Sequence, residues 1–270
     1  MTASELFDIS DRTILVTGGA RGIGRMLAEG LLLAGATVLI STRKADAAEE
    51  AGQALGDFGD VHAIAADIST EDGCRDLAEQ VASITDHLDG LVNNAGATWG
   101  APFDDFPAHA WDKVMGVNVK APFLLAQQLR PLLEASRKGP SRIINIGSID
   151  VLAVPNYENY AYSASKAAVH HLTKHMGATL APSILVNSIA PGPFPTKMMK
   201  WVLDDHGEEM RNANPLGRIG RAEDITALAT FLLAPASSFI TGTTIPLDGG
   251  LTSTMSVAMY SPENTDIQEN

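Results

Sequence analysis

The sequence predicts a single α/β domain built on a parallel β-sheet with helices on both faces. Two observations lead to this prediction. Short apolar runs rich in Val, Ile and Leu alternate with longer segments of helical periodicity from residue 12 to residue 247, an order typical of doubly wound sheets. A glycine-rich turn follows the first of these runs, and neither a break in composition nor an internal repeat marks a second domain.

Seven short apolar segments are predicted to be strands, because continuous apolar runs with β-branched residues are typical of strands that are buried on both faces. They span residues 12–17, 37–40, 61–65, 88–92, 142–146, 184–189 and 243–247. Helices are predicted at 23–34, 45–55, 70–84, 109–136, 160–179 and 221–233, with interruptions of the fourth near Pro122 and Pro131. The sequence from Ser69 to Asp72 predicts a capping box at the start of the third helix.

Residues 191–220 interrupt the alternation, with prolines at 191, 193 and 195. The stretch is too long for an ordinary connection between a strand and a helix, so we expect a small substrate lid at about residues 193–220. A surface excursion without a role is the alternative. The catalytic domain is predicted to span residues 1–251. Residues 252–270 form a C-terminal tail, polar and acidic from Tyr260 onward, which we expect to be loosely ordered unless a partner subunit holds it.

Composition and charge exclude several classes of protein. The net charge is −13, from 19 Lys and Arg against 32 Asp and Glu, which argues against nucleic acid or an anionic membrane as a partner. Cys74 is the only cysteine, so no intramolecular disulfide forms, as expected in a reducing cytoplasm. The first eight residues lack the basic and apolar regions of a secretory signal, and the apolar runs are too short to span a membrane. We therefore expect a cytoplasmic protein.

The run from Thr17 to Gly24 has the position and composition of a nucleotide-phosphate loop. It follows a predicted strand and opens a helix, whose N–H groups and dipole favour a pyrophosphate. The candidate contacts are Gly18, Arg21, Gly22, Ile23 and Gly24. Their spacing differs from the usual G-x-G-x-x-G pattern, and the Gly-Lys-Ser/Thr of a P-loop is absent. Glycines in a tight turn without a ligand are the alternative.

The end of the second strand indicates which dinucleotide binds. An acidic residue there would bind the ribose 2′-hydroxyl of NAD, but the sequence reads Ile-Ser-Thr-Arg-Lys from residue 40 to residue 44. Arg43, together with Arg21 in the glycine run, can pair with a 2′-phosphate through its forked guanidinium. The sequence therefore predicts NADP(H), the alternative being that these are solvated surface cations.

Two further segments follow predicted strands and are candidates for cofactor contacts. Asn94, Ala95 and Gly96 come after the fourth strand, where the amides can bridge neighbouring strands or contact a ribose. Asp67, followed by Ile68, comes after the third strand, where its carboxylate can accept a hydrogen bond from the adenine amino group. A helix-capping role is the alternative for Asp67.

Tyr162 and Lys166 are the candidates for acid–base chemistry. At i and i+4 they share one helix face. A nearby ammonium favours the phenolate and lowers the pKa of a tyrosine, which lets it exchange a proton with a carbonyl or alcohol oxygen. Ser148 follows a predicted strand and can hydrogen-bond the same oxygen, and Asn118 can orient Lys166 through water.

Three histidines at 170, 171 and 175 raise the question of a metal site. His171 and His175 have i, i+4 spacing, but no carboxylate completes a His-Glu-x-x-His pattern. We expect no metal, and interpret this face as solvated or turned toward another subunit.

Taken together, these motifs resemble the short-chain dehydrogenase/reductase family over residues 8–251. The matching positions are Thr17 to Gly24, Asp67, Asn93 to Gly96, Asn118, Ser148, Tyr162, Lys166, Pro191-Gly192 with Thr196, and Asp248-Gly249-Gly250. The resemblance implies a seven-stranded Rossmann sheet, a catalytic tetrad of Asn118, Ser148, Tyr162 and Lys166, and commonly a homotetramer, a dimer being the alternative. It also implies that the loop of Pro191, Gly192, Phe194 and Thr196 contacts the nicotinamide, and that Tyr162 and Lys166 contact the cofactor.

Within the family the chain is most similar to NADPH-dependent β-ketoacyl reductases of the rhamnolipid-associated branch. The similar stretches are residues 93–100, 144–148 and 189–195. One departure concerns the acyl carrier. Reductases that act on carrier-bound substrates commonly have an arginine just before the sixth strand, and residues 180–184 have none. Carrier proteins are acidic, as this chain is, so steering would need a local basic patch such as Arg130, Arg137 and Lys138.

The sequence therefore predicts an NADPH-dependent carbonyl reductase whose small-molecule substrate is a ketone or 3-oxoacyl compound, reversible as an alcohol dehydrogenase. Substrate-pocket candidates, besides Ser148, are Trp99, Tyr157, Phe194, Met198, Met199 and Trp201, although such residues also serve as core packing. Two alternatives stay open: an NAD-linked sugar, polyol or secondary-alcohol dehydrogenase, and a nucleotide-binding regulatory protein on the same fold.

Overall fold

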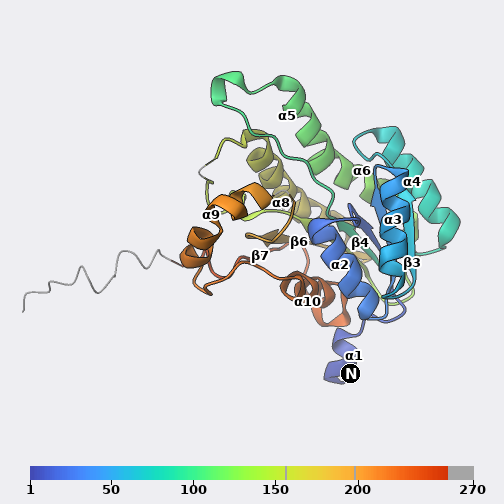
Figure 1. Ribbon diagram of the computed structural model, residues 1–270. Coiled ribbons are helices and arrows are strands. Elements are labelled where there is room, and N and C mark those ends of the chain that lie inside the picture. The colour runs from blue at the N-terminus through green and yellow to red at the C-terminus, as the bar shows by residue number, and fades with distance from the viewer. Residues whose placement is uncertain (156, 198, 255–270) are drawn as a thin grey trace, which may run out of the picture.

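The computed structural model describes residues 1–155, 157–197 and 199–254, without the side chains of residues 200–202. A seven-stranded parallel sheet in the order β3-β2-β1-β4-β5-β6-β7 forms its centre (Figure 1). The strands are β1 (Thr13–Thr17), β2 (Thr37–Thr42), β3 (Val61–Ala65), β4 (Gly90–Asn93), β5 (Ser141–Ile146), β6 (Ile184–Pro191) and β7 (Thr244–Leu247). The predicted fold class and all seven strands are confirmed.

The longer helices fall at the predicted places. They are α2 (Gly22–Leu33), α3 (Ala45–Gly56), α4 (Glu71–Ile84), α5 (Ala108–Met115), α6 (Ala121–Gln128), α8 (Tyr160–Leu180) and α10 (Ala222–Leu233). Shorter elements are α1 (Ala3–Phe7), α7 (Arg130–Glu134), the 3₁₀ turns η1 (Phe103–Asp105), η3 (Ile149–Val151) and η4 (Pro235–Ser237), and the π-helical turn η2 (Gly116–Lys120). The capping prediction at α4 is wrong by one residue. Thr70, not Ser69, is the N-cap, and its hydroxyl accepts the Gly73 N–H at 3.0 Å.

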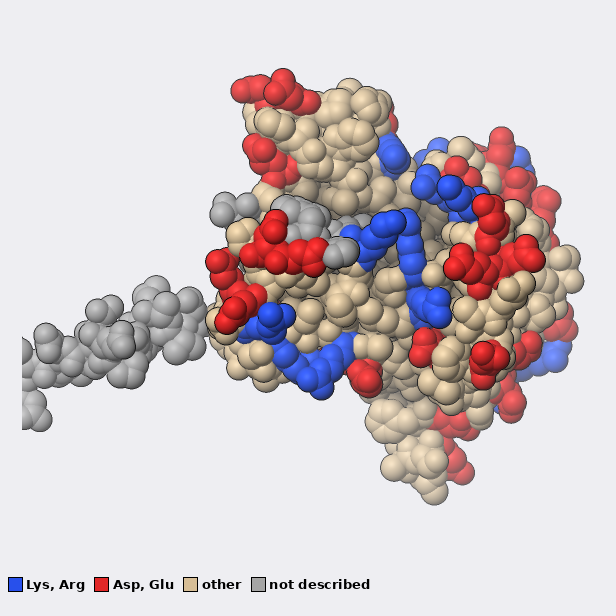
Figure 2. All heavy atoms as spheres, viewed as in Figure 1, with Lys and Arg blue, Asp and Glu red and all other residues tan. Residues whose placement is uncertain are grey.

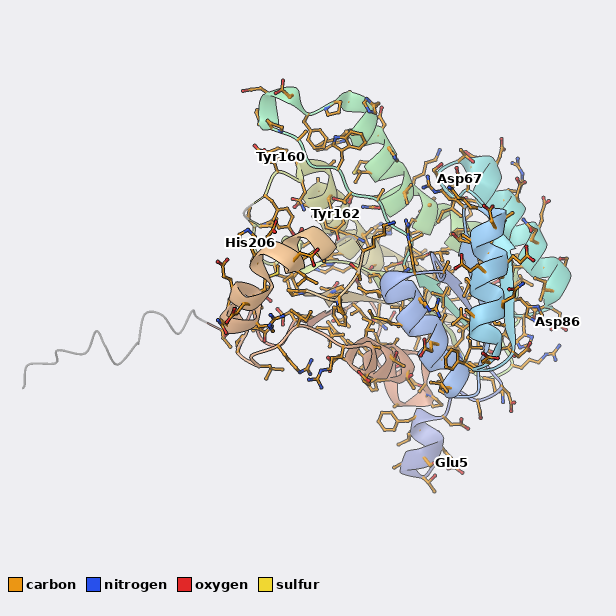
Figure 3. The ribbon with its side chains drawn as sticks, in the orientation of Figure 1. Glu5, Asp67, Asp86, Tyr160, Tyr162 and His206 are labelled. Atoms are coloured by element: carbon orange, nitrogen blue, oxygen red, sulfur yellow. The ribbon has the colours of Figure 1, made fainter. Side chains whose placement is uncertain are left out.

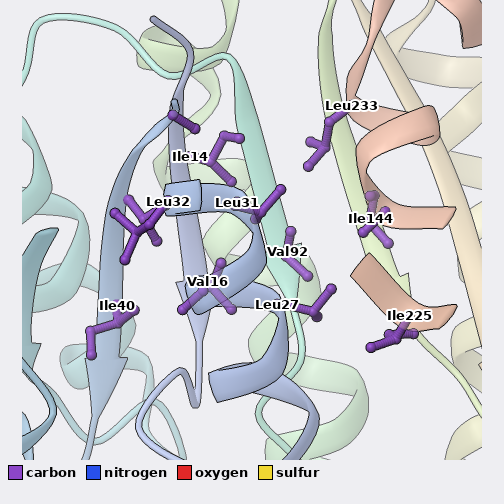
Figure 4. Close-up of a cluster of buried hydrophobic side chains, with 14 of the residues drawn as sticks. Ile14, Val16, Leu27, Leu31, Leu32, Ile40, Val92, Ile144, Ile225 and Leu233 are labelled. Carbon is purple, nitrogen blue, oxygen red and sulfur yellow. The ribbon is translucent and has the colours of Figure 1, made fainter. Parts of the chain in front are cut away.

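Side chains alternate between the two faces of the sheet and so build two apolar layers. Ile14 and Val16 of β1 join a cluster with Leu27 and Leu31 of α2 and with Ile225 of α10 (Figure 4). Leu15, between them in sequence, lies in the second cluster, which α4, α6 and α8 complete. Helices therefore cover both faces, and ligand access is left to the edge where the strands end.

Residues 193–220 form an excursion beside that edge, between β6 and α10. Its ends meet, since the Gly220 N–H donates to the Pro193 carbonyl at 2.9 Å. Where the sequence suggested an irregular segment, the structure has a helix, α9 (Lys200–Ala213). Asn214 anchors the far end of α9 by donating to the Asp248 carbonyl at 2.7 Å. Of the predicted tail, residues 255–270 lie outside the described residues.

Candidate active site

The glycine run makes a tight turn between β1 and α2. Gly18 has a φ of +67°, which favours glycine, and its N–H donates to the Ser41 carbonyl at 2.8 Å. A Cβ on Gly24 would lie 2.2 Å from the Gly18 carbonyl oxygen, so only glycine lets the helix start this close to the strand. Arg21 is the N-cap of α2 and makes no side-chain capping bond. The tight turn and the lack of a side-chain cap at the start of α2 are therefore as expected for the predicted phosphate site.

The loop that follows β6 reaches back to this turn. A Cβ on Gly22 would meet the Thr196 methyl group at 3.4 Å, and the Gly192 N–H donates to the Leu247 carbonyl at 3.0 Å. The Pro191 to Thr196 loop and the glycine run, far apart in sequence, thus line one place. Phe194 is only 2% exposed and packs against Gly220, so its ring belongs to the core and offers no surface for the predicted substrate contact.

The cations predicted to select NADP(H) lie near the end of β2. Arg21 and Arg43 are exposed, and Figure 2 shows Lys and Arg atoms gathered over the upper end of α2. A hydrogen bond with Ser69 is the largest cause that lowers the pKa of Asp67, and the Arg43 charge adds to it. The Arg43 charge therefore acts on Asp67, and both residues lie where the sequence predicts that the adenosine part of the cofactor binds.

The helix-capping alternative for Asp67 is wrong, because Thr70 caps α4. The Asp67 carboxylate instead accepts the N–H of Ser69 at 3.1 Å and is exposed. Its neighbour Ile68 is buried, so any contact that Ile68 makes with a cofactor would fall to its backbone.

Asn94 bridges the first and fourth strands, one of the two roles considered for it. Its amide group donates to the Thr17 carbonyl at 2.8 Å, and its N–H donates to the Thr17 hydroxyl at 3.0 Å. The same hydroxyl accepts the Ala95 N–H at 3.0 Å. Thr17, which the sequence analysis named only as the start of the glycine run, thus links the glycine run to the segment after β4 through hydrogen bonds.

Ser148, Tyr162 and Lys166 converge at the carboxyl edge of the sheet. Ser148 follows the end of β5 and is 6% exposed, and its hydroxyl is hydrogen-bonded to Tyr162. Lys166 lies one turn after Tyr162 on α8. Its Nζ donates to the Ile146 carbonyl at 2.6 Å and lies 5.5 Å from the centre of the Tyr162 ring. In the view of Figure 3, Tyr162 lies inside the molecule, between α9 and the segment that carries Tyr160.

The electrostatics of the pair differ from the sequence prediction. Burial and the Asp150 charge raise the pKa of Tyr162, while the hydrogen bond with Ser148 lowers it. Burial lowers the pKa of Lys166 to about 8, against the opposing effect of Asp150. The predicted lowering of the tyrosine pKa by lysine is therefore wrong for the protein by itself. Burial keeps the Tyr162 hydroxyl protonated, which is the form of a proton donor.

Asn118 lies in the π-helical turn η2, just before the proline that starts α6. Its Oδ1 accepts the Ala97 N–H at 2.8 Å, and its Nδ2 donates to the Ala97 carbonyl and to the Ser165 hydroxyl, at 2.9 and 2.8 Å. A Cβ on Gly96 would lie 3.5 Å from Asn118 Oδ1 and 3.9 Å from Lys166 Nζ. Asn118 therefore adjoins Lys166, but its side chain holds protein groups, and the predicted water contact would fall to its backbone.

The substrate-pocket candidates are dispersed. Trp99 packs edge-on against His109 of α5, with ring centres 5.5 Å apart, and the Lys113 ammonium lies 5.8 Å from its ring. Tyr157 is 44% exposed, and Met199 is half-buried at the start of α9. Met198 and the side chain of Trp201 lie outside the described residues.

Sequence reasoning missed three residues that surround the pair. Asn159 is the N-cap of α8 and is 5% exposed, and its amide donates to Asp150 Oδ2 at 3.0 Å. His170, whose helix face was interpreted as solvated or turned toward another subunit, is instead 7% exposed inside this chain, and its Nε2 accepts the Ser148 N–H over 3.4 Å. The spacing gave one clue, since His170 follows Lys166 by four residues and so shares its face. Nothing local predicted the bond between Asp150 and Asn159.

The described part of the chain contains no group of three or more His, Cys, Asp or Glu side chains placed to hold a metal. None of its helices has the length and apolar character needed to cross a bilayer.

Comparison with known proteins identifies relatives over nearly the whole chain. The profile of the protein family described as enoyl-(acyl carrier protein) reductase matches residues 18–252. The rhamnolipids biosynthesis 3-oxoacyl-[acyl-carrier-protein] reductase of Pseudomonas aeruginosa is 45% identical over 249 residues, covering 90% of this chain and 97% of the relative. The gluconate 5-dehydrogenase of Gluconobacter oxydans is 34% identical over 258 residues, covering 93% and 99%. The RhlG/NADP active-site complex of Pseudomonas aeruginosa superposes with a TM-score of 0.88 at 43% identity, covering 92% of this chain and 99% of that one.

Proposed function

The chain belongs to the short-chain dehydrogenase/reductase family, and from this premise we propose that it is an NADP(H)-dependent reductase of 3-oxoacyl compounds or related ketones. The observation that carries the proposal is the convergence of Ser148, Tyr162 and Lys166 at the sheet edge next to the glycine turn. The similarity to a 3-oxoacyl reductase and to an NADP complex supports it.

The residues divide the chemistry as follows. Tyr162 donates a proton to the carbonyl oxygen, and the Ser148 hydroxyl holds that oxygen by a hydrogen bond. The Lys166 ammonium stabilises the negative charge left on Tyr162 once the proton has moved. Asn118 acts indirectly, by holding the backbone of Ala97 and the hydroxyl of Ser165 in α8.

The residues at the glycine turn fit a phosphorylated dinucleotide, which supplies the hydride when bound. Gly18 and Gly24 let the backbone approach a pyrophosphate at the start of α2. Arg21 and Arg43 fit a 2′-phosphate, and Asp67, next to Arg43, fits the adenine. Gly96 lies beside Asn118 and Lys166, where a bulkier residue would narrow the space beside the catalytic pair.

The charge of the lid bears on whether the substrate is free or bound to an acyl carrier protein. Helix α9 carries acidic residues at positions 204, 205, 208 and 209, and acidic atoms cover its surface in Figure 2. An acidic carrier protein would be repelled from this side. A small ketone or a 3-oxoacyl ester free of a carrier is therefore the substrate form that the lid favours.

The assembly and location proposed for the enzyme follow from the same premise. We propose a cytoplasmic homotetramer. Exposed apolar side chains on α5 and α6, Trp111 at 41% and Phe123 at 47% exposed, are available for subunit contacts. Sedimentation of the purified chain tests this directly, because a monomer at micromolar concentration would contradict it.

The first experiment measures oxidation of NADPH against a panel of ketones that includes a 3-oxoacyl ester and 5-ketogluconate, with NADH in parallel. Tyr162→Phe keeps the ring but removes the proton donor, so we expect kcat to fall by about 10² to 10⁴ with NADPH binding retained. NADPH is expected to be used in preference to NADH.

Three results would redirect the proposal. Turnover of the sugar ketone alone would favour the sugar dehydrogenase alternative, which the Gluconobacter oxydans relative supports. Preference for NADH would remove the role given to Arg21 and Arg43. Binding of NADPH without turnover of any ketone would favour the regulatory alternative.

A further inference from the structure

An aspartate lies close in sequence to Ser148, whose hydroxyl is hydrogen-bonded to the proposed proton donor. Asp150 is two residues after Ser148, and its N–H donates to the Ser148 hydroxyl at 3.2 Å. Its side chain is half-buried, and its Oδ2 accepts the Asn159 amide at 3.0 Å. The backbone of Asp150 is thus tied to one member of the catalytic set.

The partner of this carboxylate is fixed to the helix that carries the other two members. Asn159 is 5% exposed, and its carbonyl accepts the N–H of Tyr162 at 2.8 Å. Its Oδ1 accepts the Ser163 hydroxyl at 3.1 Å. The loop after β5 and the start of α8 are therefore joined through Asp150 and Asn159, which fixes where the negative charge lies relative to Tyr162.

The charge of Asp150 acts on three titratable groups around it. It raises the pKa of Tyr162, of Lys166 and of Tyr157, in each case after the effect of burial. Lys166 and His170 face the same region from α8, and the Lys166 charge lowers the pKa of His170. Asp150 is the one carboxylate among these groups in the described residues, and its charge opposes formation of the Tyr162 phenolate.

We propose that Asp150, held by Asn159, is a positioning residue whose fixed negative charge adds to burial in keeping the Tyr162 hydroxyl protonated, and so shifts the pH range over which the enzyme reduces rather than oxidises. The inference rests on the proposed function, because it acts through Tyr162 as proton donor. Reduction needs the protonated hydroxyl and oxidation needs the phenolate, so Asp150 extends reduction to higher pH and moves oxidation to higher pH.

The test is Asp150→Asn, which removes the charge while keeping an oxygen that accepts the Asn159 amide. We expect the alkaline limb of the reduction profile and the acid limb of the oxidation profile both to move down by about one pH unit. Glu158→Gln is the matched control. It removes the same charge from the same loop, on an exposed side chain that accepts from Tyr160 over 3.4 Å, and should leave both profiles in place.

A merely structural role for Asp150 predicts a different result, a lower kcat at every pH with both limbs unmoved, and that would overturn the proposal. Tyrosinate absorbance gives a readout without turnover. The titration of Tyr162, obtained by difference from Tyr162→Phe, should move down in Asp150→Asn. If the wild type turns over no ketone while this titration still moves, the proposed function fails and the electrostatic inference stands. If the titration does not move, the inference fails whatever the activity.

Discussion

Two buried charged clusters lie at opposite edges of the same sheet, and they use their charge differently. At the amino edge, Arg12, Asp89 and Arg142 are all at most 3% exposed, and the Asp89 charge acts on both arginines. Asp89 accepts the Thr13 N–H at 2.9 Å and the Ser136 hydroxyl at 2.6 Å, so the counter-ion is locked within the protein. At the carboxyl edge, Lys166 donates to the Ile146 carbonyl, and the carboxylate whose charge acts on it, Asp150, is only half-buried.

The difference teaches what a buried charge is for. Burial lowers the pKa of Arg142 to about 10, and Asp89 opposes that shift, as expected of a charge balanced for stability. Burial also lowers the pKa of Lys166. The hydroxyls of its neighbours Tyr162 and Ser148, however, are placed to hydrogen-bond a substrate oxygen. One cluster should therefore govern unfolding and the other turnover.

We expect the largest effect from a substitution that disrupts the amino-edge cluster. Asp89→Asn leaves two buried arginines without their counter-ion and should lower the free energy of unfolding by about 3–5 kcal/mol, while kcat and KM of the folded enzyme stay unchanged. Urea denaturation measures the first and steady-state kinetics the second. Asp86→Asn, which removes an exposed ion pair with Arg137, should change stability little. Equal stability in both variants would contradict the comparison.

The converse change is made at the carboxyl edge. Lys166→Met keeps the length of the side chain but removes a buried charge, so the free energy of unfolding should stay the same or rise. The kcat should fall by about a hundredfold or more, because the charge that stabilises ionised Tyr162 is gone. Thermal unfolding and steady-state kinetics on the same preparation measure both. A large loss of stability would show that Lys166 serves the fold as Asp89 does.

A smaller effect depends on pH and tests His170. Burial, then the charges of Lys166 and Lys174, lower its pKa from 6.5 to about 4. Between these values the unfolded chain binds the proton and the folded chain does not. The contribution of neutral, buried His170 to the free energy of unfolding is therefore fully present above pH 6.5 and is lost as the pH falls through about 4. This contribution is at most about 3 kcal/mol.

Urea denaturation across this range compares His170→Gln with the wild type. The variant should lose less stability as the pH falls. His171→Gln, at the exposed neighbouring position, should follow the wild type. A wild-type curve that His170→Gln leaves unchanged would mean that other groups cause the acid sensitivity.

The sequence predicts the sheet well because its signals are local. Each strand is a short run of residues such as Ile14 and Val16, and glycines such as Gly18 mark the turn that a cofactor needs. Of the four catalytic candidates, Tyr162 and Lys166 came from their spacing, and the complete set came from the resemblance to the family. Helix α9 was missed because the prolines before it predicted an irregular segment, whereas they only precede it.

The rest of the site depends on contacts between distant segments. The bond between Asp150 and Asn159 joins two loops, and no periodicity encodes it. The hydrogen bonds of the π-helical turn at Asn118 span one residue more than those of the predicted α-helix, and the sequence signalled this turn only through the interruption at Pro122. Burial, which decides the direction of the Tyr162 pKa, is likewise a property of the folded chain.

The bond between Pro193 and Gly220 has a consequence for how this enzyme can change its substrate. The two ends of the excursion are joined by this hydrogen bond, and two further contacts hold the segment between them, from Asn214 to the Asp248 carbonyl and from Arg218 to Asp224 of α10. A replacement segment that keeps Asn214 and Arg218 should therefore leave β6, α10 and the proton donor in place. Grafting the corresponding segment of a sugar dehydrogenase between Pro193 and Gly220 is therefore the shortest engineering route to a new substrate range.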